Sequence, residues 1–254
     1  MKKEAGKKGQ VTIFIIVALA IIIFAILIYL FYPKMQSVFT PSYKNPFEKM
    51  KDCVEPTIEE SLEKISKRGG SMNPELYYEY NDERIAYLCY TVEDYKTCVM
   101  QKPILINSVQ EEIKKEVMKV SDECLDRLTD AYRKEGYKVE LKRGEMEIEF
   151  VPENILVKYN DILSLTKTEK EIYEGFDLRF ESKIYDLLMV ATSILEFEAY
   201  YGDSEVTTFM DYYRDLKVEK KRQADGTKIY MLENTESGEE FDFATRSLAW
   251  PAGY

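Results

Sequence analysis

The pattern of hydrophobic and polar residues separates one uninterrupted apolar run from a much longer patterned region. Residues 11–32 contain no charged side chain, and Pro33 follows them directly. A helix of this length rises about 33 Å, which is enough to cross the hydrocarbon core of a bilayer. The pattern therefore predicts a transmembrane helix over 11–32, ended by Pro33.

After the apolar run, helical and strand-like patterns follow one another. Apolar positions recur every three or four residues in three segments, which predicts helices from Phe47, from a capping box at Ser108 and Glu111, and over 183–201. A shorter helix is predicted near 206–213. Strand-like runs lie at 76–100, 137–141, 146–150, 155–159, 162–166, 172–180, 216–222 and 228–232. This mixed order predicts an α+β fold, in which antiparallel sheet packs with amphipathic helices.

Turn signals connect several of the predicted strands. Arg143-Gly144 is predicted to close a hairpin between 137–141 and 146–150, and Asp225-Gly226 a second hairpin. The segment 241–243 is predicted to add an edge strand.

The apolar run also predicts the organisation of the whole chain. The predicted parts are a lysine-rich tip over 1–10, the transmembrane helix over 11–32, a linker over 33–46 and one domain over 47–254, with a further boundary near 136–152 as an alternative. Lysines dominate the N-terminal flank of the span, whereas only Lys34 follows it closely. The positive-inside rule therefore predicts a cytoplasmic N-terminus and an extracytoplasmic domain in a single-pass protein of the cell membrane.

The junction between the tip and the apolar run carries a resemblance to a known family. Lys7-Lys8-Gly9-Gln10 followed by VTIFIIVA resembles the class III signal of archaeal type IV pilin-like proteins, and also the start of membrane-anchored proteins from small-genome archaea. In pilin-like proteins a prepilin peptidase cuts after the glycine. The resemblance, which covers residues 1–30 only, implies a cut between Gly9 and Gln10. The chain has Phe14 where many pilins carry a glutamate.

Composition restricts the chemistry that the predicted domain can perform. The chain contains no histidine, which excludes Ser-His-Asp and Cys-His triads and histidine-ligated zinc. Neither GxGxxG nor GxxxxGK[ST] occurs, so no phosphate-binding loop is predicted. The net charge is −11, and residues 1–9 contribute +3, so the rest carries −14. We therefore expect no nucleic-acid partner, no cofactor, no metal site and no enzymatic activity.

Four cysteines in an extracytoplasmic domain predict disulfides. Two β-prone runs around Glu93-Asp94 place Cys89 opposite Cys98 in a hairpin, which leaves Cys53 to pair with Cys124. The alternatives are four buried free thiols or a four-cysteine zinc site.

Tyrosines provide the main candidate contact surface. The chain has 20 tyrosines, and several cluster in one strand-like region, namely Tyr77, Tyr78, Tyr80, Tyr87 and Tyr90. Their amphipathic rings suit a protein or glycan partner, whereas the alternative is half-buried strand packing. Glu239, Glu240 and Asp242 form an acidic group that is a weaker candidate, in this case for a calcium site.

Three functional classes remain open from the sequence. The leading interpretation is a membrane-anchored surface protein of structural, adhesive or assembly type, with self-assembly among its expected contacts. The second is an anchored ligand-binding or sensor domain with a concave pocket lined by tyrosines. The third is an anchored hydrolase, which needs two convergent carboxylates, one of them buried.

Overall fold

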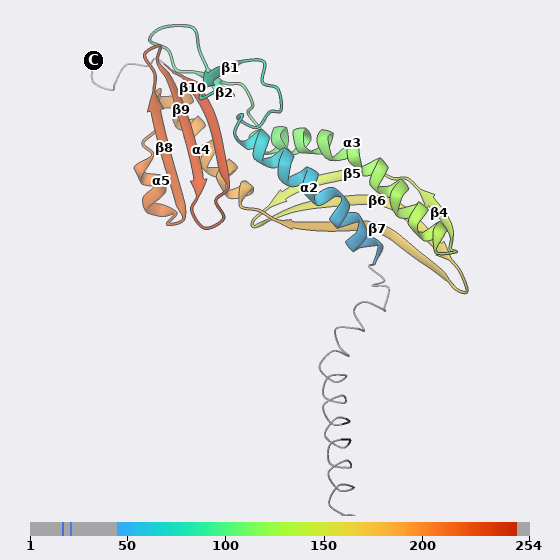
Figure 1. The fold of residues 1–254 in the computed structure, drawn as a ribbon. Coiled ribbons are helices and arrows are strands. Elements are labelled where there is room, and N and C mark those ends of the chain that lie inside the picture. Colours follow the sequence, from blue (N-terminus) through green and yellow to red (C-terminus); the bar gives the residue numbers. More distant parts are fainter. Residues whose placement is uncertain (1–16, 18–20, 22–44, 248–254) are drawn as a thin grey trace, which may run out of the picture. The chain divides into compact units, whose positions relative to one another are not determined.

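The computed structural model describes residues 45–247 together with Val17 and Ile21 (Figure 1). The chain divides into two compact units, Met1–Asn45 and Pro46–Tyr254. The proposed processing site at Gly9 and Gln10 and nearly all of 11–32 lie outside the described residues; Val17 and Ile21 are helical and exposed. Among the residues that are described, no helix has the length and apolar character needed to span a bilayer.

The first sheet of the second unit is wholly antiparallel. It consists of β4 (Lys138–Lys142), β5 (Met146–Val151), β6 (Asn154–Thr166) and β7 (Lys170–Glu181). Strands β4 and β5 pair one after the other with the same edge of β6, and β7 pairs with its other edge. The predicted hairpin at Arg143-Gly144 is therefore wrong, and the region 136–152, considered as a boundary, lies inside a continuous sheet.

Gly144 breaks the edge strand because the backbone of β6 lies directly against it. A Cβ at Gly144 would lie 2.1 Å from the backbone oxygen of Asn160, so no larger residue fits there. The Gly144 amide donates to Asp161 Oδ1 at 2.8 Å, and the Asn160 amide donates to the Glu145 carbonyl at 2.9 Å. Strand β6 is irregular at the same point, so the separately predicted strands 155–159 and 162–166 are one bulged strand.

Helices α2 (Pro46–Ser66) and α3 (Leu105–Lys134) lie side by side over one face of this sheet (Figure 1). Helix α2 continues through Pro56, and its apolar stripe is buried. Helix α3 begins three residues before the predicted capping box, because Leu105 already belongs to the buried core; the Ser108 hydroxyl instead donates to the Ile104 carbonyl within the helix. The capping-box prediction is therefore wrong.

The second sheet is mixed, which corrects the wholly antiparallel prediction. Its order is β1 (Tyr77–Tyr80), β2 (Glu83–Tyr90), β10 (Glu240–Arg246), β9 (Thr227–Asn234) and β8 (Leu216–Arg222), and β3 (Val99–Met100) also pairs with β2. Strands β2 and β10 run parallel, with Ala244 opposite Tyr87. The predicted edge strand at 241–243 thus lies inside the sheet, because its parallel partner is far away in the sequence.

Helix α4 (Ile184–Tyr201) packs on the second sheet, and Gly202 ends it in the left-handed conformation with φ 81°. The short helix α5 (Thr207–Tyr212) lies beside β8. One hydrophobic core includes buried side chains from both sheets and from α2, α3 and α4. The unit is therefore an α+β domain with a shared core.

Two disulfides cross-link this unit, one between two helices and one within the connection from β2 to β3. Cys53–Cys124 links α2 to α3, with a Cα–Cα distance of 5.9 Å, and Cys89–Cys98 has a Cα–Cα distance of 5.3 Å. Both pairings agree with the prediction, but the hairpin register does not: Cys89 lies opposite Met100, so Cys98 belongs to a longer connection. Two disulfides indicate an oxidising, extracytoplasmic compartment.

Candidate functional site

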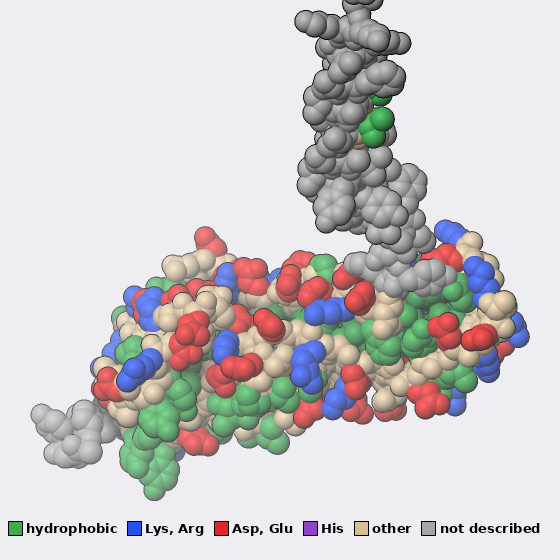
Figure 2. All heavy atoms as spheres, turned by 90° about the horizontal axis from the view of Figure 1, so that it is seen from below, with side chains coloured by type: hydrophobic (Ala, Val, Ile, Leu, Met, Phe, Trp, Pro, Cys, Tyr) green, Lys and Arg blue, Asp and Glu red, His purple; other side chains and the backbone are tan. Residues whose placement is uncertain are grey.

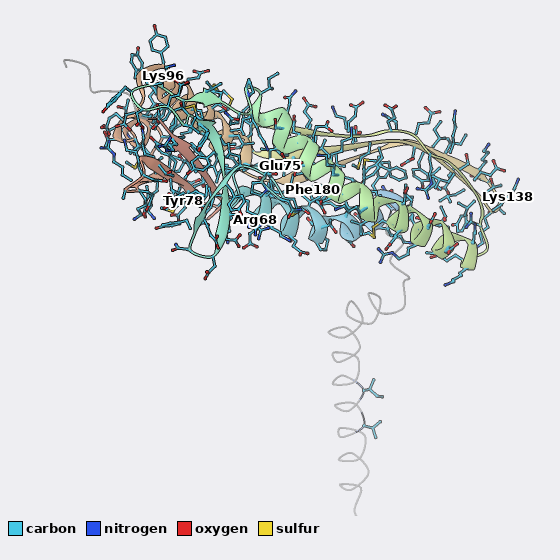
Figure 3. All side chains as sticks on the ribbon, turned by 90° about the horizontal axis from the view of Figure 1, so that it is seen from above. Arg68, Glu75, Tyr78, Lys96, Lys138 and Phe180 are labelled. Carbon is cyan, nitrogen blue, oxygen red and sulfur yellow. A yellow bond between two sulfur atoms is a disulfide. The ribbon has the colours of Figure 1, made fainter. Side chains whose placement is uncertain are left out.

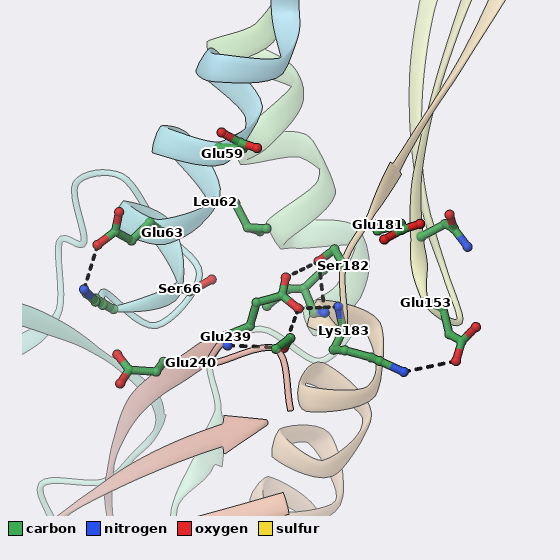
Figure 4. Close-up of a pocket in the computed structure, with 15 residues that line it drawn as sticks. Glu59, Leu62, Glu63, Ser66, Glu153, Glu181, Ser182, Lys183, Glu239 and Glu240 are labelled. Carbon is green, nitrogen blue, oxygen red and sulfur yellow. Dashed lines mark hydrogen bonds and ion pairs between the residues drawn. The ribbon is translucent and has the colours of Figure 1, made fainter. Parts of the chain in front are cut away.

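A groove of about 910 Å³ lies between α2, the β5–β6 turn, the start of α4 and the β9–β10 turn (Figure 4). Its charged lining is mostly acidic and consists of Glu59, Glu63, Glu153, Glu181, Glu239 and Glu240 with Lys67 and Lys183. The lining includes no tyrosine, so it is not the tyrosine-lined pocket expected of a sensor domain.

Contacts within the protein occupy several of these carboxylates. Glu239 accepts hydrogen bonds from the Ser182 hydroxyl and the Lys183 amide, both at 2.5 Å, and from the Ser237 hydroxyl at 3.0 Å (Figure 4). Lys183 also pairs with Glu153 at 3.0 Å. These bonds hold the β9–β10 turn against the start of α4, which gives Glu239 a structural role.

Asp242 lies beside the groove on β10 and has an unusual environment. Burial, followed by the nearby carboxylate of Glu240, raises the pKa of Asp242 to about 7, while Lys67 acts in the opposite direction. Asp242 does not line the groove, however, so it and Glu240 do not converge on one cavity. Among the described residues, no cluster of His, Cys, Asp or Glu side chains could hold a metal ion.

The tyrosines predicted as a contact surface mostly cover a small apolar cluster on the second sheet. Tyr78, Tyr80 and Tyr90 pack around a buried group that contains Tyr87. The Tyr87 hydroxyl lies 2.7 Å from Thr227 Oγ1, and burial raises the pKa of Tyr87. Tyr77 instead packs against Arg84, whose Cζ atom lies 4.8 Å from the centroid of the Tyr77 ring. Tyr87 is thus structural, and the half-buried alternative describes this cluster best. Figure 3 shows Tyr78 on this sheet, whereas Lys138 lies at the far end of the first sheet.

Another group of aromatic rings lies on α4, on α5 and directly after α5. We call it the α4–α5 aromatic surface; it consists of the exposed Phe197, Tyr200, Tyr201, Tyr212 and Tyr213 and the half-buried Phe209. Tyr200 is 77% exposed and Tyr212 is 79% exposed. Phe197 joins the two helices, since its ring stacks on Tyr201 at 5.8 Å and meets Phe209 edge-on at 6.2 Å. In Figure 2, a group of hydrophobic side chains protrudes at the lower left, on the side of the second sheet.

Beneath this surface, a buried charged network fixes the end of α4. Glu198, which is fully buried, accepts bonds from Lys228 Nζ at 2.7 and 2.9 Å and from the Tyr230 hydroxyl. Lys228 also donates to the Gly202 carbonyl at 2.5 Å, which caps the last turn of α4. Burial raises the pKa of Glu198, and Lys228 opposes that shift.

The network also reaches the smaller disulfide loop. The Ser247 hydroxyl donates to the Glu198 carbonyl at 3.2 Å and accepts from the Cys98 amide at 3.1 Å. The end of α4 that carries the exposed rings therefore contacts β9 through the Glu198–Lys228 ion pair. It contacts the Cys89–Cys98 loop through the two hydrogen bonds of Ser247.

Comparison with known proteins adds no relative to this picture. No family model matches the chain, and no curated protein or solved structure matches it significantly.

Sequence reasoning missed the α4–α5 aromatic surface. The helix 183–201 has apolar residues on most sides, which indicates a largely buried helix and gives no separate signal for the exposed Phe197, Tyr200 and Tyr201. The signal that separates them is residue type, because the buried positions of α4 are mainly aliphatic whereas its exposed rings are aromatic and mostly carry hydroxyls.

Proposed function

We propose that this chain is a single-pass, membrane-anchored surface protein whose extracytoplasmic α+β unit makes adhesive or structural contacts with a partner. The apolar run 11–32 and its lysine-rich flank support the anchor and its orientation. The two disulfides support an extracytoplasmic position for the unit. In this proposal Gly9–Gln10 is the processing site of a pilin-like signal.

The observation that carries the contact function is the α4–α5 aromatic surface. Exposed aromatic rings that gather on neighbouring elements are typical of binding surfaces, which are enriched in tyrosine and phenylalanine. Tyrosine offers a rigid contact area that remains compatible with water, as a reversible contact requires. A disulfide-linked unit suits this role because it presents the rings from a fixed framework.

The anchor is tested by fractionating cells that express the full-length chain. We expect the protein to stay in the membrane pellet after alkaline carbonate extraction, and protease added to intact cells to digest the extracytoplasmic unit. Release into the soluble fraction, or protection from external protease, would refute the proposed location. Mass spectrometry of the purified chain reports whether residues 1–9 are removed.

The contact function is tested separately by partner capture on intact cells. Chemical cross-linking should join the wild-type chain to a surface component, and Tyr200→Ser/Tyr212→Ser should reduce that product. Sedimentation of the solubilised chain separates self-assembly, which gives high-mass fibres, from contact with another molecule. An unchanged cross-linking pattern in the double variant would refute the role of these rings.

A further inference from the structure

Within the part of the chain that the structure describes, no lysine or arginine lies over a ring of the α4–α5 aromatic surface. Among the described residues, the cation–π contacts place Lys49 over Tyr132, Lys51 over Phe180, Arg84 over Tyr77 and Lys167 over Tyr137. None of these involves a ring of α4 or α5. The protein thus uses lysine and arginine against other aromatic rings but leaves this group open.

Carboxylates accompany these open rings. Glu196 lies one turn before Tyr200 on α4, and Asp211 directly precedes Tyr212 on α5; all four side chains are exposed. Neither Glu196 nor Asp211 has an ion pair within the described part of the chain. The neighbouring bases Lys220 and Arg222 are bound to Asp203, at 3.1 and 2.6 Å.

The charge of the whole second unit has the same sign. The chain carries −11, and residues 1–45 contain six lysines and one glutamate, so the remainder carries −16. This charge opposes the approach of a second copy and of anionic lipid, whereas it attracts a basic partner and speeds its encounter. An uncharged glycan would use the rings but would gain nothing from the carboxylates.

We infer that the α4–α5 aromatic surface binds a basic, amphipathic segment of another protein. Apolar side chains of that segment would cover Tyr200, Tyr201 and Tyr212, and its lysines or arginines would contact the ring faces together with Glu196 and Asp211. Arg214, which follows Tyr213, is the exposed base nearest in sequence to α5 and would weaken such a partner's binding. This inference rests on the proposed contact function and specifies the chemistry of its partner.

The test measures peptide binding to the full-length chain in phosphatidylcholine nanodiscs, with empty nanodiscs as the blank. The probe is an 18-residue helical peptide of leucine and lysine with one apolar face. Its controls are the same peptide with glutamate in place of lysine, oligolysine, and maltoheptaose as an uncharged glycan. We expect the leucine–lysine peptide to bind at least about tenfold more tightly than each control probe, because it alone offers both apolar and basic groups.

Variants separate this surface from non-specific attraction. Tyr200→Ser/Tyr212→Ser should weaken binding of the leucine–lysine peptide about tenfold, and Glu196→Gln/Asp211→Asn about threefold. Arg214→Gln should strengthen it about twofold, because it removes a positive charge next to Tyr213. Met118→Ser, an exposed apolar position on α3, should change nothing.

Several results would overturn the inference. They are absence of binding by the leucine–lysine peptide, equal binding of its glutamate version, or binding that the tyrosine pair does not affect. Maltoheptaose binding that is lost in Tyr200→Ser/Tyr212→Ser would assign the surface to glycans, and would leave the proposed contact function intact. Failure of the fractionation test would refute the anchor without altering the peptide result.

Discussion

The two sheets of this unit are joined to their helices by different kinds of interaction. Helices α2 and α3 meet the first sheet through apolar side chains, aromatic rings such as Phe47 and Phe176 included, and a few hydroxyl contacts, and a disulfide links the two helices. Helix α4 meets the second sheet around the fully buried Glu198 and its partner Lys228. The same helix then exposes aromatic rings, which the first region does not.

This difference separates what stabilises the unit from what specifies its candidate contact surface. Apolar packing tolerates exchange of one aliphatic residue for another of similar volume. A buried ion pair does not, because each charge depends on its partner. The pair Glu198–Lys228 therefore fixes the end of α4, and with it the position of the α4–α5 aromatic surface.

The largest expected effect is removal of one charge from the buried pair. Glu198→Leu should lower the free energy of unfolding by about 3–5 kcal/mol, because the buried Lys228 loses the Glu198 carboxylate at 2.7 Å and keeps only the more exposed carboxylate of Asp203 at 3.3 Å. Chemical denaturation of the full-length chain, followed by circular dichroism, measures the change. Glu198→Leu/Lys228→Met is the matched control and should cost less than Glu198→Leu alone. A larger cost in the double variant would show that the pair itself is not the source of the effect.

Removing each disulfide in turn compares how much the two contribute to the free energy of unfolding. In the chain-entropy model, replacing Cys53 and Cys124 by alanine should cost about 4 kcal/mol, against about 3 kcal/mol for Cys89 and Cys98, because their separations are 71 and 9 residues. Urea denaturation of the two double variants gives the ranking. The reverse order would mean that the Cys89–Cys98 loop, bound to α4 through Ser247, contributes more than its length implies.

The sequence predicts the positions of helices and strands better than it predicts which strands pair with one another. Helices and most strands follow from local periodicity, and both disulfide pairings follow from position on those elements. The parallel pairing of β2 with β10 does not, because no local signal marks a contact between Tyr87 and Ala244. Arg143-Gly144 shows the same limit: a glycine that closes a turn and a glycine that admits a neighbouring backbone have the same local sequence.

The candidate site shows a comparable limit. Tyrosine density pointed to the region 77–90, but burial depends on sheet pairing, and Tyr87 became part of a core. The buried ion pair of Glu198 could not be predicted either. Its partner Lys228 lies on a later strand, and the local sequence around Glu198 does not indicate that contact. Charged partners and exposed rings are properties of tertiary structure, whereas periodicity reports only the local face of each element.

Asp242, on β10 of the second sheet, predicts that the stability of the unit depends on pH. Its pKa is raised to about 7 in the folded state, chiefly by burial, against an ordinary value of 3.8. The folded state therefore holds a proton that the unfolded state releases, and this contribution to stability is lost as pH rises from about 4 to about 7. Asp242→Asn should remove this decrease of the free energy of unfolding with pH. It should also stabilise the protein at pH 8 by roughly 2 kcal/mol.

The two neighbours of Asp242 supply the controls for this effect. Glu240→Gln should lower the pKa of Asp242 and shift the slope to lower pH, whereas Lys67→Met should move it upward. Urea midpoints measured between pH 4 and pH 8 report both shifts. An Asp242→Asn variant that keeps the wild-type slope would assign the pH dependence to another group.

The smallest expected effect on stability concerns the exposed tyrosines, which are compared with a buried tyrosine. Tyr212→Ser should change the free energy of unfolding by less than about 0.5 kcal/mol, because the side chain is 79% exposed. The same substitution at Tyr87, which is 7% exposed and bonded to Thr227, should cost about 3 kcal/mol or more. Urea denaturation compares the two variants. A large loss of stability in Tyr212→Ser would mean that the ring supports the fold, and the reason to regard it as a contact residue would disappear.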